Sequence, residues 1–409
     1  MASSCQMFSA RGTGARLSRP VELICVALIV ANAALFGHTY VQDLMAPRGA
    51  ASVYDFVTTW SAGHMALTGH AAAVYDWPAL KRVDESVLGH PFDGYLGWPY
   101  PPPFFFIIAA VSVFPYAIAF VVWVFGTFLV YLAAIRAIIG DRVGYLLACA
   151  FPAVVANAVV GQNGFLSAAL IGGSLTLMEQ RPICAGALLG LLTYKPHLGI
   201  LFPIALLAGG RWRVFASAGI VAVLMAAASA AVFGIASWQE FFSSIGYALY
   251  ANGMADWGKL QSVFGVTLTL GGSETLAWTV QIVVALIAAG AIAIVWRSRA
   301  VFELKAAALG VGTLLAAPHL FAYDLAILAV PLAFLIRLGR TDGFLAHEMG
   351  GIGLACLLIL MLPAVRAPVG LAAILVVAAL IVMRALATGS VRPSRPSPSA
   401  GAGVRRAAA

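Results

Sequence analysis

Apolar segments long enough to cross a membrane recur along this chain of 409 residues, and they constrain its fold more than any other feature. A spanning helix needs about 17–25 mostly apolar residues. Segments of this length include Val21–Tyr40, Tyr116–Ile139, Val214–Phe233, Thr275–Val295 and Val369–Leu386. Only 10% of the residues are charged, whereas soluble domains average about 25%, so lipid must be the solvent. The apolar runs predict an all-α integral membrane protein with roughly twelve transmembrane helices, in a range of about 10 to 13.

The formal net charge of +8 is distributed in clusters beside the apolar segments. These clusters are Arg11, Arg16 and Arg19; Arg211 and Arg213; Arg297, Arg299 and Lys305; Arg337 and Arg340; and Arg392, Arg395, Arg405 and Arg406. Such clusters are typical of cytoplasmic loops under the positive-inside rule, and they argue against a nucleic-acid partner. We therefore expect a multi-pass protein of the cytoplasmic (inner) membrane with both chain ends in the cytoplasm.

Composition divides the chain into a transmembrane domain and two short ends. Residues 1–20 and 389–409 are basic and poor in large apolar side chains, which predicts disordered cytoplasmic ends. Residues 21–388 form the predicted transmembrane domain, with outer loops at about 46–98 and 237–272 that are too polar to span. The basic N-terminus followed by an apolar run resembles a signal peptide, but the many later spans favour its retention as the first span.

The central segment, residues 101–210, allows two topologies. Reading every apolar run as a crossing places three basic residues outside, against the positive-inside rule: Arg136, Arg142 and Arg181. In the second topology, residues 101–114 form a short re-entrant or interfacial element, and the run 183–208 is broken at Lys195-Pro196. The three basic residues then lie inside, whereas Lys195 and Gly161-Gln162-Asn163 lie at the outer face. The second topology is preferred, although the halves around Lys195 are short for crossings.

An acidic residue opens the first outer loop just beyond the first span. Asp55 is followed by Phe56 and Trp60. A carboxylate held near the membrane surface can take a proton from a hydroxyl nucleophile. The alternative interpretation is a solvated loop acid or a helix cap.

Two further motifs interrupt the apolar sequence of the first half. Trp98-Pro99-Tyr100-Pro101-Pro102-Pro103 re-enters the membrane as a rigid stretch that lacks several N–H donors. Gly161-Gln162-Asn163-Gly164 places two amides between glycines. Irregular backbone at membrane depth persists only where protein buries it or where it lines a wet cavity. The first motif is a rigid entry or a substrate wall, and the second is a plain turn or a site.

Lys195 is the most informative single residue of the sequence. It stands far from either end of an apolar run of about 26 residues, where a lysine costs at least ~2.5–3.5 kcal/mol on insertion scales. An anionic partner is therefore expected. A substrate phosphate would serve, and the alternative is an internal ion pair with an acid such as Asp324.

A polar cluster also begins a span in the second half. The sequence His319-Leu320-Phe321-Ala322-Tyr323-Asp324 brings an imidazole, a phenol and an acid together within two turns. His319 can be cationic or donate a hydrogen bond. Ionisable groups at such positions mark substrate sites or structural pairs.

These residues, in this order, resemble the GT87 family of membrane glycosyltransferases. The resemblance covers roughly residues 50–335 and is carried by Asp55-Phe56, Trp60, Ala62-Gly63, Tyr75-Asp76, Tyr100-Pro101-Pro102, Phe104, Gly161-Gln162-Asn163-Gly164, Gly190-Leu191-Leu192-Thr193-Tyr194-Lys195-Pro196 and His319-Leu320-Phe321-Ala322-Tyr323-Asp324. It implies a GT-C-like bundle with the active site beneath the first outer loop. The implied reaction moves a hexose, with mannose favoured, from a polyprenyl-phosphate donor to a hydroxyl of a glycolipid or envelope glycan, with inversion.

The resemblance also assigns roles to individual residues. Asp55 would be the general base, and Lys195 and His319 would hold the donor phosphate. Possible lining residues of the substrate site are Trp60, Tyr100, Gln162, Asn163, Tyr323 and Asp324. No metal or cofactor is expected, because the outer loops lack an Asp-x-Asp motif and the five cysteines show no metal-ligand spacing. The expected partners are the lipid-linked donor, the acceptor and membrane lipids.

Two other functions compete with this interpretation. A transporter or lipid-linked-sugar flippase could use Lys195, His319 and Asp324 as a relay or substrate site. It has little need, however, of some fifty outer residues that open with an acid. A non-catalytic scaffold protein would have no reason to keep Lys195 in apolar sequence. The sequence leaves the donor sugar, the acceptor and the oligomeric state open.

Overall fold

The computed structural model describes residues 17–45, 55–93, 96–254, 259–365 and 367–389. Within these ranges the named elements are all helices, and an isolated antiparallel bridge joins Leu260 to Phe321. The predicted disordered ends, 1–20 and 389–409, lie almost wholly outside the described residues. The exceptions are residues 17–20, of which Arg19 and Pro20 begin the first helix, α1 (Arg19–Met45), and Gly389.

Six helices in the described part of the chain are long and apolar enough to cross a membrane. They are α1, α5 (Tyr116–Ile139), α12 (Trp212–Phe233), α15 (Glu274–Arg297), the continuous unit of η5 (Ala322–Leu328) and α17 (Ala329–Asp342), and α19 (Val369–Ala387). The bent pair α6 (Val143–Ala150) and α7 (Ala153–Val160) makes a seventh if it counts as one span. This is fewer than the roughly twelve spans expected.

The difference arises because several apolar runs form helices of about half the required length. They are α8 (Gly164–Leu177), α9 (Pro182–Leu191), α11 (Phe202–Ala208), α16 (Phe302–Ala316) and α18 (Glu348–Leu360). A helix of 14 residues is about 21 Å long at 1.5 Å per residue, whereas the hydrocarbon core is about 30 Å thick. Hydropathy alone does not distinguish such a half-length helix from a crossing.

The run 183–208 breaks where the second topology places the break. Helix α9 passes through η3 (Leu192–Tyr194) to Lys195, and the one-turn α10 (Pro196–Gly199) leads into α11. Pro196 has no N–H to continue the helix. Glu179, before α9, pairs with Arg211, after α11, at 2.8 Å. Because this ion pair joins the two far ends, the chain enters and leaves the segment on the same side.

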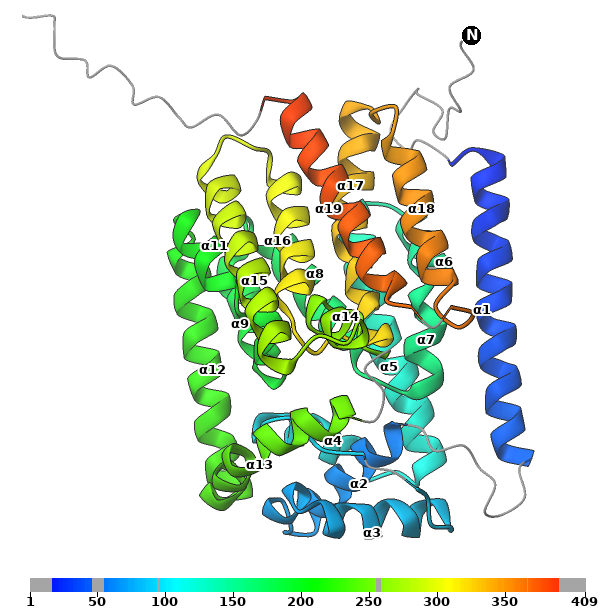
Figure 1. Cartoon of the computed structure of the whole chain (residues 1–409), viewed down its shortest axis with the longest axis vertical. Helices are drawn as coiled ribbons and strands as arrows, with labels where there is room; N and C mark the ends of the chain where they lie inside the picture. The colour runs from blue at the N-terminus through cyan, green and yellow to red at the C-terminus, as the bar shows by residue number, and fades with distance from the viewer. Residues whose placement is uncertain (1–16, 46–54, 94–95, 255–258, 366, 390–409) are drawn as a thin grey trace, which may run out of the picture.

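A second ion pair brings the other disputed basic residues to the same end as Arg340. Arg340, in the last turns of α17, binds Asp141 at 2.5 Å, and Asp141 lies between Arg136 and Arg142. Figure 1 shows this end of the molecule at the top, where the turns between α5 and α6, α11 and α12, and α15 and α16 gather.

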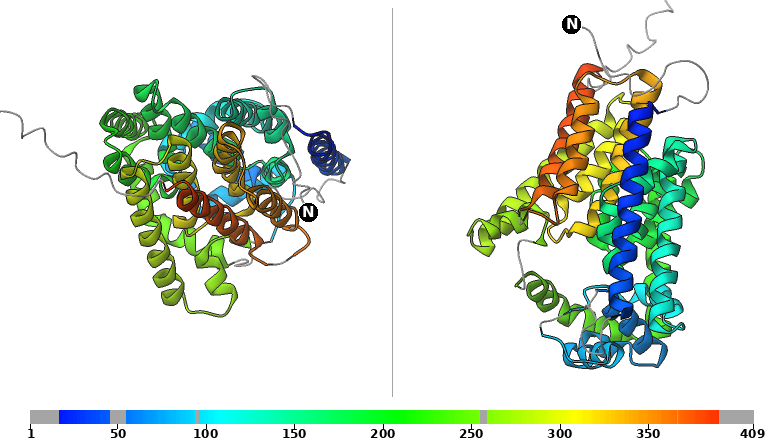
Figure 2. Two further views of the ribbon diagram at one scale, coloured as in Figure 1. Left: turned by 90° about the horizontal axis from the view of Figure 1, so that it is seen from above. Right: turned by 90° about the vertical axis from the view of Figure 1, so that its right-hand side faces the viewer.

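The opposite end is a separate layer of short helices (Figures 1 and 2). It contains α2 (Phe56–Leu67), η1 (Ala72–Tyr75), α3 (Trp77–Leu88), η2 (Pro102–Phe104), α4 (Phe105–Val111) and α13 (Ile235–Met254). Both predicted outer loops are thus largely helical. Residues 101–114 do not cross, since α4 has seven residues and packs on α2. We call these helices the short-helix layer.

The polar motifs lie between the short-helix layer and the half-length helices. Helices α7 and α9 end there, α8 begins there, and η5 begins there after α16 ends. Helix α14 (Val263–Thr269) also lies at this depth. In contrast, α1 stands at the side of the body and has only 6% of its apolar window buried. Because the half-length helices end inside the molecule, side chains far apart in sequence meet at their ends.

Candidate functional site

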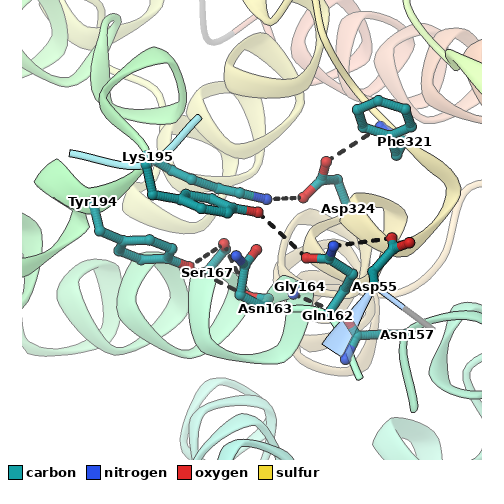
Figure 3. Close-up of polar contacts among 11 residues, drawn as sticks. Asp55, Asn157, Gln162, Asn163, Gly164, Ser167, Tyr194, Lys195, Phe321 and Asp324 are labelled. Atoms are coloured by element: carbon teal, nitrogen blue, oxygen red, sulfur yellow. Dashed lines mark hydrogen bonds and ion pairs between the residues drawn. The ribbon is translucent and has the colours of Figure 1, made fainter. Parts of the chain in front are cut away.

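Asp55 lies at the start of α2, whose first residues Phe56 and Val57 are fully buried. It occupies the N-cap position of α2, but its carboxylate makes no capping bond to the helix. Instead, Oδ2 accepts a hydrogen bond of 3.0 Å from Nε2 of Gln162. The carboxylate thus points toward the turn between α7 and α8 (Figure 3).

The surroundings of Asp55 act on its pKa in opposite directions. Burial raises the pKa of this carboxyl above its usual value, because the charged form loses hydration. The hydrogen bond from Gln162 and the charge of Lys259 lower it. The net shift is upward, which makes Asp55 a stronger base than an exposed aspartate.

The Gly161–Gly164 turn is built to hold Gln162 in place. Gly161 has φ +67°, a conformation that suits glycine. A Cβ on Gly164 would lie 2.2 Å from the backbone oxygen of Tyr323, so only glycine allows this close approach. Asn157 Oδ1 accepts a 2.8 Å hydrogen bond from the Gly164 amide. Gln162 is then free to bridge Asp55 and the hydroxyl of Tyr100, which donates to its Oε1 at 3.3 Å.

Lys195 is buried between η3 and α10, and its ammonium binds Oδ1 of Asp324 at 2.6 Å. The two side chains are only 4% and 1% exposed. Oδ2 of Asp324 accepts a hydrogen bond of 3.2 Å from the Phe321 amide. The internal ion pair left open by the sequence is therefore present. An ammonium has three donors, so this pair does not exhaust Lys195.

Two aromatic rings join the Lys195 pair to the Asp55 side of the site. The Lys195 ammonium lies 5.2 Å from the ring centre of Tyr323 and 5.9 Å from that of Tyr100. Such distances allow cation–π attraction. Tyr100 thus contacts Gln162 through its hydroxyl and faces Lys195 through its ring.

His319 lies on the loop between α16 and η5, beside two aromatic rings. Its ring centre is 5.4 Å from that of Phe264 and 5.9 Å from that of Trp278. Burial lowers its pKa to about 4. Of the two roles expected from the sequence, hydrogen-bond donor or cation, the neutral donor is the one favoured at pH 7.

The structure does not bring every predicted lining residue into the site. Trp60 lies within the short-helix layer, where its Nε1 donates to the Phe114 carbonyl at 2.9 Å and its ring stacks on His64. Asn163, in contrast, is buried within the site: its side chain interacts with Tyr100, and its backbone carbonyl accepts from the Tyr194 hydroxyl at 3.3 Å. Tyr194 in turn bonds Ser167 at 2.6 Å.

Sequence reasoning missed two features of this site. The exposed Lys259 acts electrostatically on Asp55, although it lies 204 positions away in the chain. The sequence around this lysine, an aromatic segment of a predicted outer loop, does not indicate that it lies near Asp55. Tyr194 was visible as the neighbour of Lys195, but its bond to Ser167 was not. Within the described residues, no group of three or more His, Cys, Asp or Glu side chains could hold a metal ion.

The apolar helices indicate a multi-pass membrane protein, and the candidate site lies between helix ends within it. Its class is membrane glycosyltransferase, because the family model "Glycosyltransferase family 87" matches residues 98–320, more than half of the chain. The chain belongs to glycosyltransferase family 87. No curated protein and no solved structure matches it.

Proposed function

We propose that this glycosyltransferase moves a hexose, with mannose favoured, from a polyprenyl-phosphate carrier to a hydroxyl of a glycolipid or envelope glycan. The proposal includes a GT-C-type body and a site open to the outer face of the cytoplasmic membrane. One observation carries it. A base, Asp55, and a cation, Lys195, lie on either side of Tyr100. The hydroxyl of Tyr100 bonds Gln162, which bonds Asp55, and the ring of Tyr100 faces the Lys195 ammonium.

The reaction follows as a single displacement with inversion. Asp55 accepts the proton of the acceptor hydroxyl, while the hydroxyl oxygen forms a bond to the anomeric carbon of the sugar. The bond from that carbon to the phosphate oxygen breaks, and its electron pair stays on the phosphate. The Lys195 ammonium stabilises the negative charge that develops there, and the neutral imidazole of His319 donates a hydrogen bond.

The ion pair of Lys195 with Asp324 is compatible with this role. Two of its three N–H donors remain for a phosphate, while the carboxylate holds the ammonium in place. Pairing with Asp324 also reduces the cost of burying a lysine in the absence of donor.

The side of the membrane follows from charge. The end with the ion pairs Arg211–Glu179 and Arg340–Asp141 also carries Arg297 and Arg299, at the turn between α15 and α16. The positive-inside rule assigns such an end to the cytoplasm. The short-helix layer, and with it Asp55, would then face outward.

The test uses purified protein in lipid nanodiscs, polyprenyl-phosphate hexoses and a membrane-lipid extract as acceptor. We expect polyprenyl phosphate to be released in step with acceptor glycosylation, most rapidly from the mannose donor. Comparing the rates with donors that carry different hexoses identifies the preferred sugar, and the Asp55→Asn variant is the inactive control. Transbilayer movement of the donor in sealed liposomes, without release of polyprenyl phosphate, would instead indicate a flippase.

A further inference from the structure

A buried histidine next to the site has no role in the reaction described above. His197 lies on α10, two residues after Lys195. Its Nε2 is buried and has no hydrogen-bond partner among the described residues. Buried polar atoms in native proteins are nearly always hydrogen-bonded, so an orphaned ring nitrogen calls for an explanation.

The local backbone fixes His197 relative to Lys195. The Lys195 amide donates to the Leu192 carbonyl at 2.9 Å, and the Leu198 amide donates to the Lys195 carbonyl at 3.0 Å. Pro196 restricts the intervening backbone. Lys195 and His197 therefore belong to one tight turn.

His197 lies near the proposed phosphate-holding residues in the fold, and its burial, more than any neighbouring charge, disfavours a positive charge on it. It interacts with both Lys195 and His319, and each interaction disfavours a positive charge on His197. Helix α10 packs against α16, whose C-terminal end leads to His319. Lys195 and His197 thus share one turn, and His319 follows the helix that packs on this turn. Asp324 balances the charge of Lys195.

Such a group suits an anion that needs several donors. A phosphate monoester, the form that remains when the sugar leaves its carrier, has three terminal oxygens and up to two negative charges. Lys195 can supply charge, while a neutral imidazole supplies an N–H donor without adding to the repulsion among the nitrogen groups. A bound phosphate would also give the buried Nε2 the partner that it lacks.

We propose that His197 is a third phosphate-binding residue, whose Nε2–H donates to an oxygen of the polyprenyl phosphate held by Lys195 and His319. The proposal rests on the proposed function and deepens it, because it assigns the product-binding part of the site. It requires the tautomer that carries the proton on Nε2.

The experiment measures binding of a short-chain polyprenyl phosphate to the full-length protein in nanodiscs. We expect His197→Phe, which fills the space without a donor, to weaken binding about tenfold, as loss of one hydrogen bond to a charged group does. His197→Gln keeps an N–H donor and should stay within about threefold of wild type. His347→Phe is the matched control, because His347 also has a buried, unpartnered Nε2 but lies at the N-cap of α18.

Thermal unfolding without ligand shows whether each variant is folded, and His197→Leu replaces His197→Phe if the larger ring is not accommodated. The role of His197 is overturned if a folded His197→Phe or His197→Leu variant binds polyprenyl phosphate as tightly as wild type while Lys195→Met binds it weakly. That result leaves the proposed function intact. Failure of the wild type to release polyprenyl phosphate from any hexose donor contradicts the proposed function and this inference with it.

Discussion

Asp55 must be ionised to act as a base, and its burial together with two neighbours decides at which pH this happens. Burial raises its pKa, whereas Gln162 and Lys259 lower it. Since the net shift is upward, kcat/KM should fall on acidification at a higher pH than an ordinary aspartate would give.

The Gln162→Leu variant tests this balance. It removes a hydrogen bond that stabilises the charged carboxylate, so the acid limb of kcat/KM should move up by about one pH unit. Profiles of wild type and variant between pH 4 and 9 measure the shift. Gln239→Leu, an exposed amide on α13, is the control and should leave the limb in place. An unchanged limb in Gln162→Leu would contradict the assigned hydrogen bond.

Replacing the base itself should have the largest effect on the rate. Asp55→Asn keeps the shape and the contact with Gln162 but cannot accept a proton, so transfer should fall on the order of 10²–10⁴-fold. Steady-state release of polyprenyl phosphate measures this loss. Asp76→Asn changes an exposed acid of the same layer and should retain activity. Activity within about threefold of wild type in Asp55→Asn would remove Asp55 from the mechanism.

The Lys195–Asp324 pair predicts separate effects on stability and on binding. Lys195→Met strands a buried carboxylate, and breaking such a pair costs about 3–5 kcal/mol of unfolding free energy. Adding Asp324→Asn should restore most of the Tm but not donor binding, because the phosphate still lacks its cation. Thermal unfolding with and without donor measures both quantities. A double variant that binds donor like wild type would show that Lys195 does not hold the phosphate.

At this scale the sequence named several residues that lie together in the structure, but it did not predict the contacts between them. Asp55 and Gln162 were both named as candidates, yet their hydrogen bond joins positions 107 apart in the chain. Lys195 required an anionic partner, and both a phosphate and Asp324 satisfied that requirement. Insertion cost depends on residue type and depth, and therefore does not identify the partner.

The short-helix layer depends on a buried acid that holds α2 against α3. Asp84 of α3 is fully buried and accepts a 3.1 Å hydrogen bond from the Thr58 hydroxyl of α2. Burial raises its pKa to about 7. A raised carboxyl pKa means that the folded protein favours the protonated form, so this site loses stability as pH rises from about 4 through 7.

Asp84→Asn imitates the protonated acid and should remove this loss. We expect the free energy of unfolding of the variant to exceed that of wild type by up to roughly 4 kcal/mol at pH 8 and to match it near pH 4. Tm measured from pH 4.5 to 8.5 gives the comparison. Glu85→Gln, the neighbouring acid paired with Lys81, is the control. Parallel pH profiles for wild type and Asp84→Asn would contradict a protonated Asp84.

Among the elements, the break at Lys195-Pro196 was predictable and the half-length helices were not. A proline after a lysine inside an apolar run removes a backbone N–H donor and places a charge in apolar sequence, and both disfavour a continuous spanning helix. Pro318 and Pro363 follow α16 and α18 and favour an end to each helix. They do not indicate how these helices of 15 and 13 residues are placed in the bilayer. That depends on tertiary packing, of α16 against η5 and of α18 against α19.

The charge distribution of the whole molecule predicts its orientation. In a variant without native cysteines, single cysteines at Ser86 on α3 and Ser243 on α13 should react with an impermeant reagent outside intact cells. A cysteine at Thr341, at the basic end, should react only after permeabilisation. All three positions are exposed. Labelling of position 341 from outside would reverse the orientation and place the site on the cytoplasmic side.

The pairing of Lys195 with Asp324 also has a consequence for biosynthesis. The partners are 129 residues apart, and ribosomes add about 5–20 residues per second. The growing chain must therefore hold an unpaired lysine in or beside the bilayer for roughly 6–26 s before its counter-ion is made. Until then the broken α9–α11 segment cannot complete its burial, so this part of the site is assembled only after the C-terminal helices reach the membrane.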